Sequence, residues 1–210
     1  MKQRVLILSG PTHEYIDPVR FIGNASSGKM GKALAEEAVR AGYAVEFVTG
    51  PVAEQNLPSL EPLTVHAVTS AEEMLATAQP LFALADIIIF AAAVADYAPA
   101  QTLTEKITKS TEELVLRLRP TPDIAQTLCA EKKAHQMAMG FALQTSDGEK
   151  NARRKLASKN LDGIVLNTPA TLGAENGTFC LFEMKSERVS DWGYISKTQC
   201  AKKIFEFIKS

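Results

Sequence analysis

The sequence predicts an α/β protein with a doubly wound, mostly parallel sheet and helices on both faces of that sheet. Short apolar runs, typical of buried parallel strands, alternate with amphipathic helical segments over the first 97 residues. The alternation returns between residues 136 and 167. At 210 residues, 46% of them hydrophobic, the chain has the size of one domain with a substantial core. We therefore expect residues 1–210 to fold as a single domain.

The first half of the chain supplies the clearest elements. The run "RVLILSG" (4–10) predicts a buried strand, and a long polar loop follows it. The spacing of Met30, Leu34 and Ala38 predicts an amphipathic helix, which Gly42 ends. The elements expected in this half are this helix at 28–43, strands at 44–50 and 63–68, a helix at 70–85 opened by a Ser70–Glu73 capping box, and, over 86–97, a buried strand that runs into a loop.

The second half changes character before it returns to the α/β pattern. Residues 113–121, "ELVLRLRPT", alternate apolar and polar side chains and predict a half-exposed strand. The remaining expected elements are a helix at 122–134, a strand at 136–143, a helix at 151–160, a strand at 162–167, a hairpin at 178–192 and a closing helix at 196–208 with Ser196 as its N-cap.

Composition excludes several classes of protein. No apolar run approaches the roughly 18 residues that a membrane span requires, and no signal peptide precedes the first strand, so we expect a cytoplasmic protein. The net charge of -1 gives no broad basic surface for nucleic acid. Cys129, Cys180 and Cys200 are far apart and odd in number, which predicts reduced thiols rather than disulfides or a zinc site.

The stretch "GNASSGKMG" (23–31) invites comparison with a phosphate-binding P-loop. Gly23, Gly28 and Lys29 fit the pattern G-x-x-x-x-G-K, but Met30 replaces the Ser or Thr that would hold magnesium. A genuine P-loop also follows its strand directly, whereas this stretch lies well beyond the end of the first one. A dinucleotide-binding fingerprint is disfavoured as well, because no G-x-G-x-x-G follows any expected strand.

A more general anion site remains compatible with this stretch. Ser26 and Ser27, with the backbone amides of Gly28 and Lys29, lie at the start of an expected helix, where the helix dipole favours negative charge. The alternative is that these residues only cap the helix.

Other candidate residues follow expected strands, near the edge where ligands bind in open α/β sheets. Asp96 carries a carboxylate suited to ribose hydroxyls or a metal, although it could equally cap a turn. Lys155 and Lys159 share one helix face, where their like charges repel unless an anion or carboxylate compensates. Lys106 and Lys109 lie in a loop and could simply be solvated.

Seven collinear blocks across almost the whole chain together resemble one known family, phosphopantothenoylcysteine synthetase. The blocks are "GPT" with "IDPVRFI", "N-x-SSGKMG", "AAAVADY", "EKI", "TPDI", "GFA" and "ARRKL-x-x-K-x-x-D-x-I-x-x-N". In many bacteria this synthetase is fused to an amino-terminal flavin-dependent decarboxylase, which this sequence does not contain. The resemblance therefore implies a stand-alone synthetase without flavin, with the decarboxylase as a separate partner.

The resemblance implies an activity and an architecture. Family members join 4'-phosphopantothenate to cysteine with a nucleoside triphosphate and Mg²⁺, usually with CTP in bacteria and with ATP as the alternative. The carboxylate attacks the α-phosphate, pyrophosphate leaves, and the cysteine amine takes the acyl group. The implied fold is Rossmann-like with an added β extension, near residues 97–121, through which family members form homodimers.

The resemblance also assigns roles to residues. Lys106 is similar to the lysine that stabilises the activated phosphoryl centre, and Asn24 to the asparagine that handles the acyl intermediate. Asp96 would hold the ribose or, indirectly, the metal. Lys155 and Lys159 would grip the triphosphate. The base and sugar would lie against Phe90, Ala91, Ala92, Pro122, Asp123, Ile124, Ala125 and Phe141, and the phosphopantothenate would be bound by Arg20, Asn24, Ser26, Ser27 and Gly28.

Some positions depart from the family pattern. Residues that differ from the usual ones are His13 and Tyr15 in place of Arg and Pro, Gly23 in place of Ser, Thr108 in place of a basic residue, and Gln144 in place of Glu. Two rival hypotheses therefore stay open: a relative that binds nucleotide without turnover, and an NAD(P)-dependent oxidoreductase on a related fold.

Overall fold

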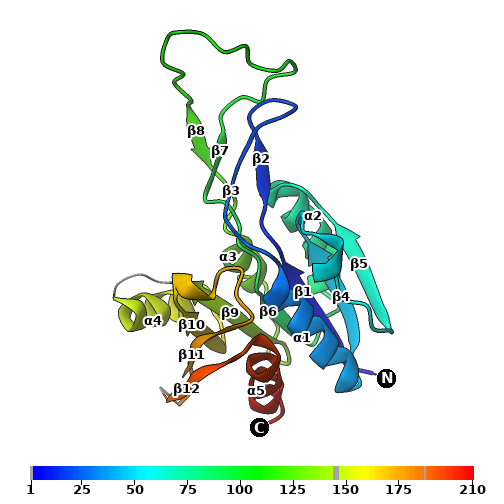
Figure 1. The fold of residues 1–210 in the computed structure, drawn as a ribbon. Helices are drawn as coiled ribbons and strands as arrows, with labels where there is room; N and C mark the ends of the chain where they lie inside the picture. Colours follow the sequence, from blue (N-terminus) through cyan, green and yellow to red (C-terminus); the bar gives the residue numbers. More distant parts are fainter. Residues whose placement is uncertain (1, 144–146, 187) are drawn as a thin grey trace.

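The computed structural model describes residues 2–143, 147–186 and 188–210. Gln144, one of the departures from the family pattern, lies outside these residues. The main sheet has the strand order β12-β11-β10-β9-β6-β1-β4-β5 (Figure 1). Its strands are β1 (Arg4–Ser9), β4 (Ala44–Thr49), β5 (Leu63–Ala67), β6 (Ile87–Phe90), β9 (Met137–Leu143), β10 (Gly163–Asn167), β11 (Asn176–Glu183) and β12 (Val189–Ser196).

Strand order and direction are those of a doubly wound sheet. From β5 to β10 all neighbouring strands pair in parallel, whereas β11 and β12 pair antiparallel at one edge. The chain builds outward from β1 in one direction through β4 and β5, and then in the other through β6, β9 and β10. The order therefore reverses between β1 and β6, the position where open α/β sheets bind ligands. The predicted fold class is confirmed.

Helices cover both faces of this sheet (Figure 1). Alternate residues of β1 face opposite ways: Val5 and Ile7 pack with α1 (Lys29–Arg40) and α5 (Lys197–Lys209), and Leu6 and Leu8 pack with the helices on the other face. Those helices are α2 (Ala71–Phe82), α3 (Ile124–Cys129) and α4 (Gly148–Ser158). Both faces of β1 are thus buried, as its continuous apolar run predicts.

Two hairpins form an arm that projects from the sheet (Figure 1). β2 (His13–Tyr15) pairs with β3 (Phe21–Gly23), and β7 (Tyr97–Pro99) pairs with β8 (Leu118–Pro120). We call residues 11–25 and 97–120 the arm. The expected loop after β1 therefore contains a hairpin, which its prolines and polar residues conceal.

Most predicted elements are confirmed, including the Ser70–Glu73 capping box of α2 and the N-cap Ser196 of α5. The structure adds that Ser196 forms a capping box with Gln199. Two predictions are wrong in extent. The strand expected over 113–121 is confined to β8, because within one chain no sheet covers the apolar side chains before it, and Val115 is 81% exposed. The helix expected over 122–134 ends at Cys129, where bonds to the residue three positions back tighten the last turn.

Two short 3-10 helices, η1 (Glu54–Asn56) and η2 (Pro169–Thr171), complete the described structure. Among the described residues, no helix is both long and apolar enough to cross a membrane. All three cysteines are free, as predicted. Burial raises the pKa of the Cys129 thiol to about 11 and that of the Cys200 thiol to about 12, so both are held as unreactive thiols.

Candidate functional site

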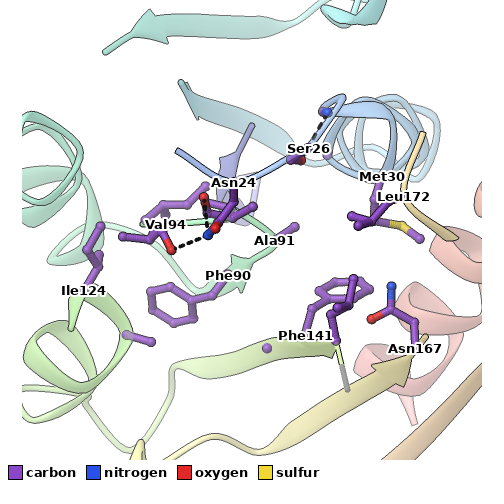
Figure 2. A pocket seen from close by; sticks show the side chains of 18 of the residues that line it. Asn24, Ser26, Met30, Phe90, Ala91, Val94, Ile124, Phe141, Asn167 and Leu172 are labelled. Atoms are coloured by element: carbon purple, nitrogen blue, oxygen red, sulfur yellow. Dashed lines mark hydrogen bonds between the residues drawn. The ribbon is translucent and has the colours of Figure 1, made fainter. Parts of the chain in front are cut away.

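A cavity of about 740 Å³ opens beyond the carboxyl ends of β1, β6, β9 and β10 (Figure 2). It lies at the point where the strand order reverses, beside the start of α1. The predicted site residues that line it are Asn24, Ser26, Ser27, Gly28, Phe90, Ala91, Ala92, Asp96, Pro122, Asp123, Ile124, Ala125, Phe141, Lys155 and Lys159. Segments more than 130 residues apart in the sequence thus meet at one place.

The start of α1 leaves backbone donors for a ligand. Its N-cap residue, Gly28, adopts the left-handed conformation with φ 76° and ψ -5°, and glycine has no side chain to cap the first turn. The Ser26 hydroxyl accepts a weak hydrogen bond from the Gly28 N–H at 3.4 Å. Because the first-turn N–H groups border the cavity and carry the positive end of the helix dipole, this geometry favours the anion site over simple capping.

Asn24 links the start of α1 to the segment that follows β6. Its Nδ2 donates to the carbonyl of Val94 at 2.8 Å and to that of Ala93 at 3.4 Å (Figure 2). The 93–96 segment is itself held in place, because the Thr12 hydroxyl accepts from the Ala95 N–H at 2.9 Å. Asn24 is therefore exposed at the mouth of the cavity yet fixed in orientation by a secured backbone.

One wall of the cavity is apolar. Phe90 ends β6 and Phe141 lies on β9, and Figure 2 shows both rings facing the cavity. The 122–125 segment closes the same wall where it enters α3. A flat aromatic surface beside exposed backbone is suited to a planar base.

Charged side chains also line the cavity. Lys159 forms an ion pair with Asp123, whose carboxylate oxygens lie 3.0 and 2.9 Å from Nζ. The same carboxylate caps α3 by accepting the Gln126 N–H at 3.1 Å. The repulsion expected between Lys155 and Lys159 is therefore reduced by a carboxylate of the protein.

Lys155 is the less compensated of the two lysines. Burial and the neighbouring Lys159 charge lower its pKa, and the carboxylate of Asp96 only partly opposes them. Among the described residues no carboxylate forms an ion pair with Lys155. An anion bound in the cavity would therefore interact favourably with it.

The donor set gives limited support for a metal. No group of three or more His, Cys, Asp and Glu side chains gathers in the part of the chain that the structure describes. Mg²⁺ in nucleotide sites is commonly held by one or two carboxylates together with substrate phosphates. Of the two carboxylates among the described residues that line the cavity, that of Asp123 is paired with Lys159 and that of Asp96 forms no ion pair. This fits a Mg²⁺ ion that arrives with a nucleotide rather than one held by the protein alone.

Two predicted site residues lie outside the cavity. Arg20 and Lys106 are on the arm, and neither lines the cavity. The Arg20 guanidinium is bound to Asp17 and to the carbonyl of Ile107, the residue after Lys106. Their roles in binding and catalysis therefore remain predictions, since a single chain does not bring these two side chains to the cavity.

Three of the departures from the family pattern pack together on the arm. His13 stacks on Phe21 with ring centroids 3.7 Å apart, and Tyr15 lies against the same ring. Gly23 faces His13 across the hairpin, where a Cβ atom would lie 2.8 Å from the carbonyl oxygen of Thr12. A residue larger than glycine would collide there, so Gly23 fits the packing around His13. The fourth, Thr108, is exposed.

Some side chains that line the cavity had been given no role from the sequence. Asn167 ends β10, and its Nδ2 donates to the Thr171 hydroxyl at 2.6 Å. Lys197 is only 7% exposed and donates to the carbonyls of Thr171, at 3.0 Å, and Ala174. Asn167 could have been predicted as a site residue, because it is a polar residue at the carboxyl end of an expected strand. Lys197 is the first residue of α5, far in sequence from the other cavity residues, and no local pattern marks it as a site residue.

Residues 1–210 match the family described as DNA/pantothenate metabolism flavoprotein C-terminal domain. The chain belongs to this family. The resemblance predicted from the seven blocks is thereby confirmed. A solved structure of the same family, the C-terminal domain of the coenzyme A biosynthesis bifunctional protein CoaBC, is 37% identical, with a TM-score of 0.83 over 98% of this chain and 93% of that one.

Curated relatives are longer than this chain. A cysteine/cysteine sulfinic acid decarboxylase from an unknown prokaryotic organism is 49% identical over 175 residues, covering 83% of this chain and 48% of the relative. The CoaBC protein of Bacillus subtilis (strain 168) is 43% identical over 175 residues, covering 83% of this chain and 42% of the relative. The chain thus spans about half the length of the curated relatives it matches.

Proposed function

We propose that this chain is a phosphopantothenate–cysteine ligase of coenzyme A biosynthesis. It activates 4'-phosphopantothenate with CTP, releases pyrophosphate, and passes the acyl group from the acyl-cytidylate to the amine of cysteine. The observation that supports this proposal most directly is a cavity that joins an uncapped helix start, an aromatic wall, two lysines and Asn24 at the switch point of the sheet.

The proposed chemistry needs positive charge more than a protein nucleophile. Negative charge builds on the α-phosphoryl oxygens and on the leaving pyrophosphate. The α1 N-terminus, Lys155 and Lys159 supply donors and cations there, and one such positioned group typically contributes about 3–4 kcal/mol. Holding the carboxylate next to the nucleotide can lower the barrier by a further ~7–11 kcal/mol.

Asn24 is suited to the second step. Its amide nitrogen donates to two backbone carbonyls, so the direction of its side-chain oxygen is fixed before any substrate binds. We assign to that oxygen the task of orienting the cysteine amine toward the acyl carbon. Asp96 is assigned to the nucleotide ribose or to the Mg²⁺ that accompanies the triphosphate, where the ion would neutralise phosphate charge.

A buried acceptor in the cavity wall supports a base with an exocyclic amine. The Thr171 hydroxyl donates to the carbonyl of Thr168 at 2.7 Å, so it must accept from the Asn167 amide rather than donate to it. This orients Oδ1 of Asn167 away from Thr171, and among the described residues that buried oxygen has no partner. Cytosine and adenine carry an amine that could satisfy it, whereas uracil does not.

The position of Arg20 and Lys106 supports a homodimer as the working form. Both lie on the arm, which exposes many apolar side chains, among them Val19, Phe21, Tyr97, Leu114 and Val115. We propose that a cytoplasmic homodimer forms through the arm and that this assembly carries Arg20 and Lys106 to the substrates. The product would then pass to a separate flavin-dependent decarboxylase.

The proposal is tested by measuring pyrophosphate release from CTP and 4'-phosphopantothenate before any cysteine is added. We expect release with CTP, with ATP as a weaker substrate and UTP inactive, and a product of the expected mass after cysteine addition. Lys106→Ala should suppress the first step, because a cation at the reacting centre is lost. Asn24→Asp should let the acyl-cytidylate form and accumulate.

Matched variants separate these roles from folding. Lys109→Ala removes an exposed cation from the same loop and should leave release unchanged. If no nucleotide yields pyrophosphate at any cysteine concentration, the ligase proposal is wrong and the non-catalytic relative is favoured. Undiminished amide formation by Asn24→Asp would remove the role assigned to Asn24.

A further inference from the structure

We propose that Asp17 is a positioning residue, which fixes the backbone beside Lys106 on the arm. This inference rests on the proposed function, in which Lys106 acts on the activated phosphoryl group. Asp17 lies on the turn between β2 and β3, 90 residues before Ile107. Its side chain is fully buried.

Asp17 and its ion-pair partner hold both polar groups of the Ile107 residue. Oδ2 of Asp17 accepts the Ile107 N–H at 3.1 Å, and Arg20 Nη1 donates to the Ile107 carbonyl at 3.1 Å. The same Nη1 donates to Asp17 Oδ2 at 2.5 Å, so Asp17, Arg20 and the Ile107 backbone form one connected hydrogen-bond network. The N–H that Asp17 holds belongs to the peptide bond joining Lys106 to Ile107, so the lysine is attached directly to the fixed point.

This contact stands out within an otherwise exposed segment. From Gln101 to Pro120 every residue except Ile107 is exposed, and the segment pairs as a strand only at β8. A second tie lies just upstream, where the Leu103 N–H donates to the Ile16 carbonyl at 2.9 Å. Lys106 is thus bracketed by two attachments to the β2–β3 hairpin. The loop that carries it therefore has a defined position on the arm.

The charge of Asp17 is secured in the folded protein. Burial alone would raise its pKa, but the N–H groups of Ile107, Val19 and Arg20 and the Arg20 guanidinium outweigh it and lower the pKa to about 2. The carboxylate is therefore ionised throughout the neutral range. A buried carboxylate without these donors would raise the free energy of the folded chain. The hydrogen bonds to Asp17 therefore favour the state in which the 106–107 segment is docked.

The two carboxylate oxygens of Asp17 have separate tasks, which allows a selective variant. Oδ1 accepts the N–H groups of Val19 and Arg20, both at 2.8 Å, and shapes the turn. Oδ2 serves Arg20 Nη1 and Ile107. Asp17→Asn can keep an oxygen that accepts the Val19 and Arg20 N–H groups, while an NH₂ group replaces the Oδ2 that accepts from Arg20 Nη1 and Ile107. The turn should fold, and the attachment of Ile107 should be lost.

Limited trypsin digestion tests whether Asp17 holds the Ile107 backbone, and it needs no assay of activity. Trypsin can cut after Lys106, at the fixed peptide bond, and after Lys109, in the exposed part of the same loop. We expect Asp17→Asn to raise the ratio of cleavage after Lys106 to cleavage after Lys109 at least about tenfold. Glu72→Gln is the matched control, since it replaces a carboxylate that pairs with Arg119 on the arm but does not touch Ile107.

Activity then tests whether the attachment positions Lys106. Because a misplacement of about 1 Å can cost about 100-fold in rate, we expect Asp17→Asn to lower kcat for pyrophosphate release at least about tenfold. The Kd for CTP, measured by calorimetry, should change less than about twofold, since the cavity residues are untouched. Glu72→Gln should change neither quantity.

The outcomes separate this inference from the proposed function. An unchanged cleavage ratio in Asp17→Asn overturns the attachment, and an altered ratio with unchanged kcat overturns the positioning role. A parallel loss of CTP binding would point to general unfolding and would also overturn it. If the wild-type chain releases no pyrophosphate, the proposed function fails, while the cleavage ratio still decides whether Asp17 holds the segment.

Discussion

Lys155 shows at the scale of one residue how the fold prepares a cation for an anionic ligand. Burial and the charge of Lys159 already lower its pKa in the ligand-free chain. Lys159 forms an ion pair with Asp123, whereas among the described residues Lys155 has no carboxylate partner of its own. A triphosphate would stabilise the protonated amine, so binding should raise the pKa that the fold lowers.

The affinity for CTP should therefore depend on alkaline pH. Affinity is greatest where free Lys155 is protonated and falls as the pH rises above its lowered pKa, which lies below the ordinary lysine value of about 10.4. Lys155→Arg should remove this fall, because a guanidinium stays protonated with a pKa above about 12. Titration calorimetry between neutral and alkaline pH measures the effect. Lys150→Arg, on the exposed face of α4, is the control, and a pH-independent wild type would contradict the prediction.

At the scale of the element, α1 begins at a position that requires glycine. Gly28 has a φ of 76°, and a Cβ atom there would lie 2.7 Å from Cγ1 of Val52. The left-handed conformation costs an L-residue about 1–2 kcal/mol, and the contact adds to that cost. The glycine therefore both ends the preceding loop and leaves the first-turn amides accessible.

We predict that Gly28→Ala lowers the free energy of unfolding by about 2 kcal/mol or more and weakens CTP binding. Denaturant titration measures the first quantity. Gly42→Ala is a matched control, because Gly42 also has a positive φ, 91°, yet nothing lies within 4 Å of its added Cβ. Gly28→Ala should be the more destabilising of the two. The double variant Gly28→Ala with Val52→Ala removes the side-chain branches that the new Cβ would contact. If it recovers none of the extra stability that Gly28→Ala loses relative to Gly42→Ala, the contact with Val52 is not the cause of that loss.

At the scale of the whole molecule, the arm is the part whose surface one chain leaves open. The sheet and its helices bury two apolar clusters between them, whereas Leu114 and Val115 on the arm are 61% and 81% exposed. Exposed apolar side chains gathered on one projection are typical of an interaction surface. This is the structural support for pairing of two copies through the arm.

We expect the double variant Leu114→Glu with Val115→Glu to convert the proposed homodimer into monomers, with loss of pyrophosphate release. Sedimentation equilibrium measures the assembly, and an unchanged melting temperature would show that the body is intact. Leu84→Glu places the same charge at a residue 61% exposed but off the arm, and it should leave the dimer in place. A wild-type monomer at all concentrations would contradict the homodimer proposal.

The sequence by itself determined the parallel sheet, its helices and the family. Periodicity and caps are local properties, so the Ser70–Glu73 box and the run at β1 could be recognised before any fold was known. Most of the site residues that the resemblance predicts do line the cavity, because they lie in contiguous blocks at the ends of strands. Local pattern failed for residues 113–117, whose alternation suggests a strand but which one chain leaves uncovered.

Only the tertiary structure decided the contacts between segments distant in sequence. It placed Lys106 and Arg20 on the arm rather than in the cavity, brought Lys197 to the cavity wall, and joined Asp17 to Ile107. No local pattern reports such contacts, because a carboxylate in a turn and an amide 90 residues later meet only when the two hairpins of the arm are packed side by side. The sequence therefore specifies which groups are present, and the packing of the hairpins and strands specifies which of them act together.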